Sequence, residues 1–89
     1  MRQIKLHKQA ARFVTSVPPK QKRQIAATLV SLQEIVQPHD SKKLVGYDFY
    51  RVDCGEYRVI YTWDDSTVYV FIIGKRNDGD VYRKLQRFK

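Results

Sequence analysis

The hydrophobic pattern of this chain changes once, and that change constrains the fold more than any other feature. The first part has helical spacing, a polar connection follows at residues 37–43, and apolar residues then alternate with polar ones up to Gly74. Three segments of the alternating part are rich in aromatic and β-branched residues, and tight-turn sequences separate them. These segments are residues 48–54, 57–63 and 67–73. We therefore expect a meander of three antiparallel strands in the second half of the chain.

Two helices are expected before the meander. Alternation over residues 2–6 indicates a short first strand, and the spacing becomes helical from His7 to about Ser16. Pro18-Pro19 begins a second helix, because proline is tolerated in a first helical turn, where its missing N–H has no partner to lose. This helix has an apolar stripe and stops before Pro38. The stripe consists of Ile25, Leu29, Leu32 and Val36.

The order of these segments predicts an α+β fold in one domain spanning residues 1–89. We expect an antiparallel sheet, made of the N-terminal strand and the three-strand meander, with the two helices packed on one face. Val81, Leu85 and Phe88 have helical spacing and predict a short C-terminal helix over residues 80–88. A chain of 89 residues has no room for separate modules, so we place the function on the face that the helices leave free.

The first hairpin decides which side chains share the free face. With Gly55-Glu56 as a two-residue type II′ loop, Asp53 pairs with Arg58, and Arg51 pairs with Ile60. Directly paired residues point to the same side of a sheet. We therefore expect Arg51, Asp53 and Arg58 to lie opposite the helices.

The second hairpin adds aromatic side chains to the free face. Pairing Trp63 with Val68 and continuing the alternation divides the last strand between the two sides. This sends Val68, Val70 and Ile72 toward the helices and leaves Tyr69, Phe71 and Ile73 beside Arg58. Guanidinium groups hold phosphates and aromatic rings stack on unpaired bases, a combination suited to single-stranded RNA. A solvated face with a cross-strand ion pair between Asp53 and Arg58 accounts for the pattern equally well.

The charge balance favours a polyanionic partner. The chain has 17 Lys and Arg residues against 9 Asp and Glu, a formal net charge of +8, and no acidic residue precedes Arg23. Such a field attracts nucleic acid or an acidic protein, and solubility alone would need a much smaller excess of charge.

Several functions and locations are not expected. The chain has one cysteine and no recognisable targeting segment at its start, which favours the cytoplasm. Its longest apolar run, residues 68–73, is too short to span a bilayer, so we expect no membrane segment. His7 and His39 lack other ligands at suitable spacing, and no cofactor motif occurs, so we expect neither a metal nor a cofactor.

Four groups of motifs follow one another along the second half of the chain. They are Lys43-Leu44-Val45-Gly46 with Tyr50-Arg51-Val52, Gly55-Glu56-Tyr57-Arg58-Val59-Ile60-Tyr61, Val70-Phe71-Ile72-Ile73-Gly74-Lys75-Arg76, and Val81-Tyr82. With the two preceding helices, their order and spacing resemble the RelE/ParE superfamily of bacterial toxins over nearly the whole chain. The resemblance implies that fold. RelE-like members cut messenger RNA in the ribosomal A site, without a metal, through attack of a ribose 2′-hydroxyl on the adjacent phosphate.

The resemblance assigns roles to five residues. Arg58 matches the strand arginine that stabilises charge developing on the phosphate, and Arg76 matches a second arginine that assists the leaving oxygen. Tyr82 matches the tyrosine that stacks on and orients the substrate. Arg51 matches the first of two basic residues in the preceding strand, whereas Asp53 stands where RelE has the second. Asp53 is then either a general base for the 2′-hydroxyl or an ion-pair partner that neutralises Arg58.

The resemblance also implies partners. Lys42, Lys43 and Lys75 are expected to contact phosphates and ribosomal RNA, a cognate antitoxin to bind the basic surface, and operator DNA to be bound only by the toxin–antitoxin complex. The ParE branch shares the fold but poisons DNA gyrase and lacks the catalytic set. Because Arg58, Arg76 and Tyr82 occur together, we favour a toxin of a type II system that acts as a ribosome-dependent endoribonuclease, an mRNA interferase. Two alternatives are a gyrase-poisoning toxin without enzymatic activity and a basic binding module that acts only with its antitoxin on operator DNA.

Overall fold

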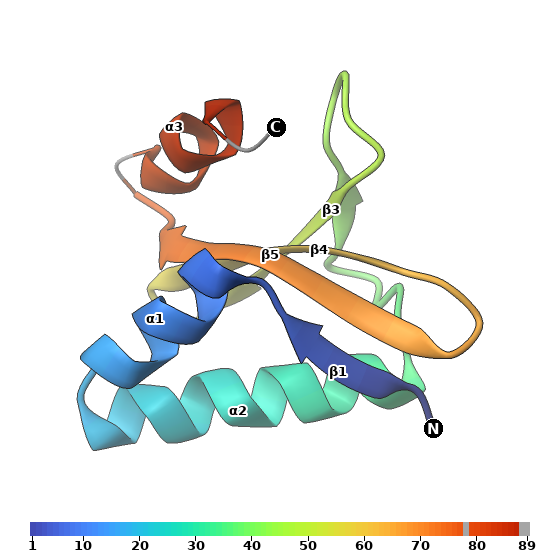
Figure 1. Ribbon diagram of the computed structural model, residues 1–89, viewed down its shortest axis with the longest axis horizontal. Helices are drawn as coiled ribbons and strands as arrows, with labels where there is room; N and C mark the ends of the chain where they lie inside the picture. The colour runs from blue at the N-terminus through green and yellow to red at the C-terminus, as the bar shows by residue number, and fades with distance from the viewer. Residues whose placement is uncertain (78, 88–89) are drawn as a thin grey trace.

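The computed structural model describes residues 1–77 and 79–87, and its elements follow the predicted order. Two helices come after the first strand, the meander occupies the second half, and a short helix comes last (Figure 1). A two-residue strand within the polar connection was not predicted. The elements are β1 (Gln3–Leu6), α1 (Lys8–Ser16), α2 (Pro19–Glu34), β2 (Lys42–Lys43), β3 (Tyr50–Cys54), β4 (Tyr57–Trp63), β5 (Thr67–Lys75) and α3 (Asp80–Gln86). The α+β class is as predicted.

The strands form one mixed sheet in the order β1-β5-β4-β3-β2. The meander is antiparallel, as predicted, but β1 runs parallel to β5, with Gln3 opposite Thr67 and Leu6 opposite Val70. The expected antiparallel direction of the N-terminal strand is thereby corrected. A tight turn forces its two strands to be antiparallel, whereas no turn joins β1 to β5, so no local sequence signal sets the direction of this pair.

Helices α1 and α2 cover one face of the sheet, below it in Figure 1. The larger core lies between them and the strands, and Ile25, Leu29 and Leu32 of the predicted stripe are buried in it. Tyr61 is fully buried there, and its hydroxyl donates a hydrogen bond of 2.7 Å to the carbonyl oxygen of Val36. Burial raises the pKa of Tyr61 to about 12.

A β-bulge in β5 changes which side chains face the helices. Ile60 pairs with Ile72, but the next residue, Tyr61, pairs with Val70, so Phe71 is an extra residue in β5. One extra residue reverses the alternation beyond it. Ile73 therefore packs in the core on the helix side, and Ile72 packs with Ile60 on the other face. The prediction that Ile72 faces the helices and Ile73 lies beside Arg58 is wrong.

The face opposite α1 and α2 is not entirely free, because α3 lies on it, above the sheet in Figure 1. Val81 and Leu85 of α3 are buried against Ile60 and Ile72 in a second, smaller core. Phe88, the third apolar residue predicted for this helix, lies outside the described residues. Among residues 1–77 and 79–87, every helix falls short of the length and apolar character that crossing a bilayer needs.

Candidate functional site

The β3–β4 hairpin brings Asp53 and Arg58 together. The two residues are directly paired, with Cys54 and Tyr57 flanking the two-residue loop, as the sequence predicts. Gly55 has φ of +59°, and a Cβ there would come within 2.7 Å of the Gln24 side chain. Glu56 does not have positive φ, and a positive φ at the first loop position alone is typical of a type II′ turn. The turn therefore fixes the register that places Asp53 opposite Arg58.

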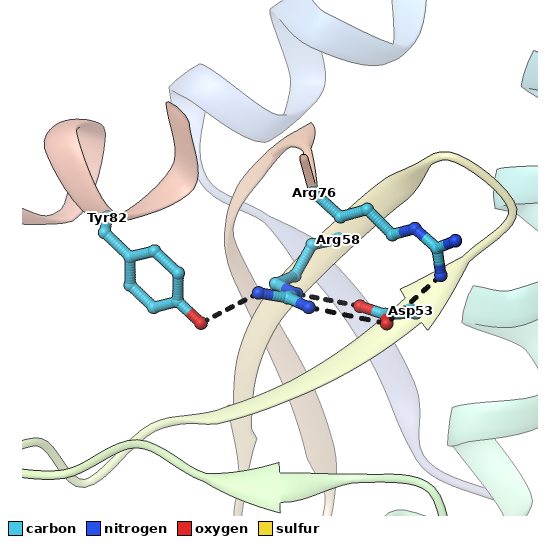
Figure 2. Close-up of polar contacts among 4 residues, drawn as sticks. All are labelled: Asp53, Arg58, Arg76 and Tyr82. Atoms are coloured by element: carbon cyan, nitrogen blue, oxygen red, sulfur yellow. Dashed lines mark hydrogen bonds and ion pairs between the residues drawn. The ribbon is translucent and has the colours of Figure 1, made fainter. Parts of the chain in front are cut away.

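The guanidinium of Arg58 donates two hydrogen bonds to the carboxylate of Asp53. Arg58 Nε lies 2.8 Å from Asp53 Oδ1, and Nη2 lies 3.4 Å from Oδ2 (Figure 2). The side chain of Arg58 is 15% exposed and that of Asp53 is 33% exposed. This forked contact is the geometry with which arginine binds carboxylates and phosphates.

Arg76, the residue that follows β5, contacts the same carboxylate. Its Nη1 lies 3.5 Å from Asp53 Oδ2, and its backbone N–H donates a 3.1 Å hydrogen bond to the carbonyl oxygen of Glu56. The backbone contact holds the end of β5 against the β3–β4 hairpin. Two arginines therefore converge on one carboxylate.

Tyr82 approaches Arg58 from the opposite side to Asp53, as Figure 2 shows. Arg58 Nη1 donates a 3.0 Å hydrogen bond to the hydroxyl oxygen of Tyr82. The guanidinium carbon lies 5.8 Å from the ring centre, but the hydroxyl points at the guanidinium, so the hydrogen bond describes this contact better than a cation–π stack does. Burial of the neighbouring Val81 fixes α3 on the sheet and so sets the place of Tyr82.

The charges in this cluster stabilise one another. The hydrogen bond from Arg58 lowers the pKa of Asp53, and the positive charges of Arg58, Arg76 and Arg51 add to the effect, although burial opposes it. In return, the hydrogen bond to Asp53 raises the pKa of Arg58. Asp53 is therefore ionised at neutral pH, and the cluster keeps a net positive charge.

Arg51 and the three lysines predicted as phosphate contacts occupy different places. Arg51 pairs with Ile60 and with Lys42 of β2, so both basic residues lie on the face of Arg58. Lys43 is exposed, and its Nζ lies 3.9 Å from Oδ1 of Asp48. Lys75 pairs with Tyr57, whose ring packs on the helix-side core, so the structure does not bring Lys75 to the cluster.

A groove of about 410 Å³ opens next to the cluster, between the loop that joins β2 to β3 and helix α3. Its lining contains three basic side chains, and Tyr82 connects it to Arg58. The lining residues are Lys42, Lys43, Leu44, Val45, Tyr47, Arg51 and Tyr82. Basic and aromatic side chains in one groove suit an unpaired nucleotide.

The sequence matches one family model over residues 4–79, that of the ParE toxin of type II toxin–antitoxin systems, parDE. The chain belongs to this toxin family. Its motifs therefore resemble the RelE/ParE superfamily because it is a member, and the protein is the toxin of a type II toxin–antitoxin system. A comparison with curated proteins found no match.

Solved RelE structures share the fold of this toxin. The toxin of an archaeal RelE–RelB complex from Pyrococcus horikoshii OT3 matches with a TM-score of 0.74 and 29% identity, over 86% of this chain and 97% of that one. A mutant of E. coli RelE in the free state matches with a TM-score of 0.77 and 22% identity, over 99% of this chain and 98% of that one. The E. coli RelBE toxin–antitoxin complex matches with a TM-score of 0.74 and 22% identity, over 86% and 99% of the two chains.

Tyr47 and Val45 of the toxin line the groove but were missed from the sequence. A signal for them exists, because Val45 is 97% exposed and Tyr47 is 41% exposed, and both lie within four residues of the Lys42-Lys43 pair. Exposed apolar residues beside a basic pair indicate a binding surface. Among residues 1–77 and 79–87, no three His, Cys, Asp or Glu side chains gather as a metal site would need, and the expectation of a metal-free site stays a prediction.

Proposed function

We propose that this toxin is a metal-independent endoribonuclease that cleaves messenger RNA in the ribosomal A site and thereby inhibits translation. One observation carries the proposal. Arg58, Arg76 and Tyr82 come from three separate segments and meet on one accessible face, where both arginines contact the carboxylate of Asp53 and Tyr82 accepts a hydrogen bond from the other side of Arg58. A gyrase poison or a purely structural sheet face has no need of two arginines and a tyrosine in one hydrogen-bonded group.

The proposed reaction is an internal transfer at phosphorus. The 2′-oxygen of one nucleotide forms a bond to the adjacent phosphorus as its proton leaves, and the bond from phosphorus to the next 5′-oxygen breaks. The proton of the 2′-hydroxyl passes to water, and the leaving 5′-oxygen takes up a proton from water in its place, so the products are a 2′,3′-cyclic phosphate and a 5′-hydroxyl. Arg58 stabilises the charge on the non-bridging oxygens, and Arg76 assists the leaving 5′-oxygen.

Asp53 acts in this proposal as an ion-pair partner and not as the general base. Arg58 and Arg76 engage both of its oxygens, and the lowered pKa makes the carboxylate a poor proton acceptor. The scissile phosphate replaces the Asp53 carboxylate on the two donors of Arg58, because carboxylate and phosphate fit the same guanidinium geometry.

The remaining roles follow from position and charge. Tyr82 is 36% exposed at the edge of the groove, where its ring stacks on a base and orients the substrate. Arg51 and Lys42, on the same face, hold neighbouring phosphates or ribosomal RNA. A cognate antitoxin covers this basic surface in the cytoplasm, and operator DNA is bound only by the toxin–antitoxin complex.

Primer extension on messenger RNA in a translating extract tests the proposal. We expect cuts at codon-defined positions with the wild-type toxin and none with Arg58→Ala. Arg23→Ala is the matched control, because Arg23 is exposed on α2, on the opposite side of the sheet, and it should cut as the wild type does. Uncut messages in all three samples would disprove the nuclease.

The match to the ParE family model favours one other function, poisoning of DNA gyrase. The same protein preparations can be incubated with gyrase and supercoiled DNA, and covalent gyrase–DNA complexes can be trapped with detergent. Such complexes without any cut message would identify a gyrase poison. Cut messages without trapped complexes would support the nuclease.

A further inference from the structure

The loop between β2 and β3 is built to hold an aromatic ring at the rim of the groove. Leu44 is buried in the smaller core, and its N–H donates a 2.9 Å hydrogen bond to the carbonyl oxygen of Phe49. The backbone N–H of Tyr47 closes the turn by donating a 3.4 Å hydrogen bond to the carbonyl oxygen of Leu44. Gly46, within this turn, has a φ of +83°. The loop is therefore fixed at both ends and does not depend on a ligand for its shape.

The ring of Tyr47 is held in one orientation while a large part of it stays exposed. It stacks on Phe49 with ring centres 6.0 Å apart and an angle of 13° between the planes. Phe49 in turn contacts Phe71, the bulge residue of β5, at 4.6 Å between ring centres. Tyr47 nevertheless keeps 41% of its surface exposed. A ring that is already oriented loses little entropy on binding, which favours stacking on a flat ligand.

The chemistry of the groove selects a nucleotide over a peptide. Lys42, Lys43 and Arg51 line it, and two tyrosines from different elements, Tyr47 of the loop and Tyr82 of α3, border it. Cationic groups beside aromatic faces match the phosphate and the base of a single-stranded nucleic acid. Because Tyr82 also contacts Arg58, the groove continues directly from the cluster that holds the scissile phosphate in the proposed function.

We propose that the groove binds the nucleotide next to the scissile phosphate, and that Tyr47 stacks on its base. This inference rests on the proposed nuclease function and adds a residue that selects unpaired RNA. The basic side chains hold the phosphate of that nucleotide. Tyr47 is a positioning residue, since it touches the substrate away from the bond that breaks.

Binding of a short RNA that cannot be cleaved tests the inference separately from catalysis. The probe is a fluorescently labelled, single-stranded hexanucleotide of 2′-O-methyl RNA, and the measurement is fluorescence anisotropy. We expect Tyr47→Ala to weaken binding about tenfold, the size of one lost base stack. Tyr47→Phe keeps the ring and should bind within about twofold of the wild type. Val30→Ala removes an exposed apolar side chain from α2, on the opposite side of the sheet, and is the control.

A set of hexanucleotides with one abasic site each shows whether the loss comes from stacking. With the wild type, one abasic position should weaken binding about as much as Tyr47→Ala does. With Tyr47→Ala, the same abasic site should cause no further loss, because the stack is already missing. A variant whose fold was damaged would instead stay sensitive to that position, which would count against the inference.

Two other outcomes would overturn the inference. The first is equal affinity of Tyr47→Ala and the wild type for the hexanucleotide, and if that variant also loses its cognate antitoxin, the groove is a peptide site. The second is no binding of the hexanucleotide at all. Neither of these decides the nuclease itself, because cleavage of messages that depends on Arg58 is measured independently in the translating extract.

Discussion

Asp53 accepts two hydrogen bonds from Arg58 across a directly paired position of β3 and β4, at 2.8 Å and 3.4 Å. The contact occupies the donors that a phosphate needs. In the proposed function, substrate binding therefore requires Asp53 to release at least one of its hydrogen bonds with Arg58. The side chain of Asp53 is 33% exposed, so it can rotate toward solvent.

Asp53→Asn should retain at least half of the wild-type cleavage. An amide keeps the size of the side chain but removes the negative charge, so Arg58 is less restrained, and no general base is lost if Asp53 is only an ion-pair partner. The measurement is single-turnover cleavage on ribosomes programmed with a defined message. A loss of about 100-fold or more would instead make Asp53 the general base.

The stability that Asp53 contributes should disappear in acid. Its pKa in the folded protein lies below the ordinary value of 3.8, so the ion pair stabilises the fold above about pH 4 and is lost as the pH falls through the lower, folded-state pKa. Urea unfolding of the wild type and Asp53→Asn should differ at pH 6, by about 0.2–1 kcal/mol for a partly exposed pair. The difference should shrink toward zero as the pH falls below 3.8. A difference that grows in acid would contradict this account.

Tyr61→Phe should lower the free energy of unfolding by about 1 kcal/mol. The variant removes the hydroxyl that donates a 2.7 Å hydrogen bond to the carbonyl oxygen of Val36, and it leaves that carbonyl without this donor. Chemical denaturation at neutral pH measures the change. Tyr69→Phe, which loses an exposed hydrogen bond to Asp64, is the control and should change stability less.

Ile73→Val should destabilise the toxin by about 0.5–1.5 kcal/mol, because Ile73 is fully buried on the helix side of the bulged strand. The uninterrupted alternation read from the sequence puts Ile73 at the surface, where the same change has little effect. Urea denaturation distinguishes the two. A change near zero would mean that β5 has no bulge at this point.

Local rules of the sequence predict the part of the site that lies in one hairpin. The Gly55-Glu56 loop and the alternation of β3 and β4 suffice to pair Asp53 with Arg58, because a tight turn determines the register of its own strands. Arg76 and Tyr82 could be assigned only through the family resemblance. Their approach to Asp53 and Arg58 depends on the packing of Val81 and on the contact between Arg76 and Glu56, neither of which follows from periodicity.

Three other features were beyond the sequence for physical reasons. The direction of β1 is set by its distant partner β5, with no turn between them. The bulge at Phe71 adds one residue whose place no alternation rule reveals, since the residues around it are all apolar. The position of Tyr47 depends on a loop closed by backbone hydrogen bonds and by stacking on Phe49, which polar and apolar patterning does not encode.

Single-turnover cleavage on programmed ribosomes tests whether Arg58 stabilises the charge that develops during cleavage. Arg58→Ala should cut about 10²–10³-fold more slowly than the wild type. Arg58→Lys should also stay below the wild type, because an ammonium group has charge but no forked donors. Arg23→Ala should cut at the wild-type rate. Cleavage by Arg58→Ala at the wild-type rate would show that Arg58 does not stabilise the reaction.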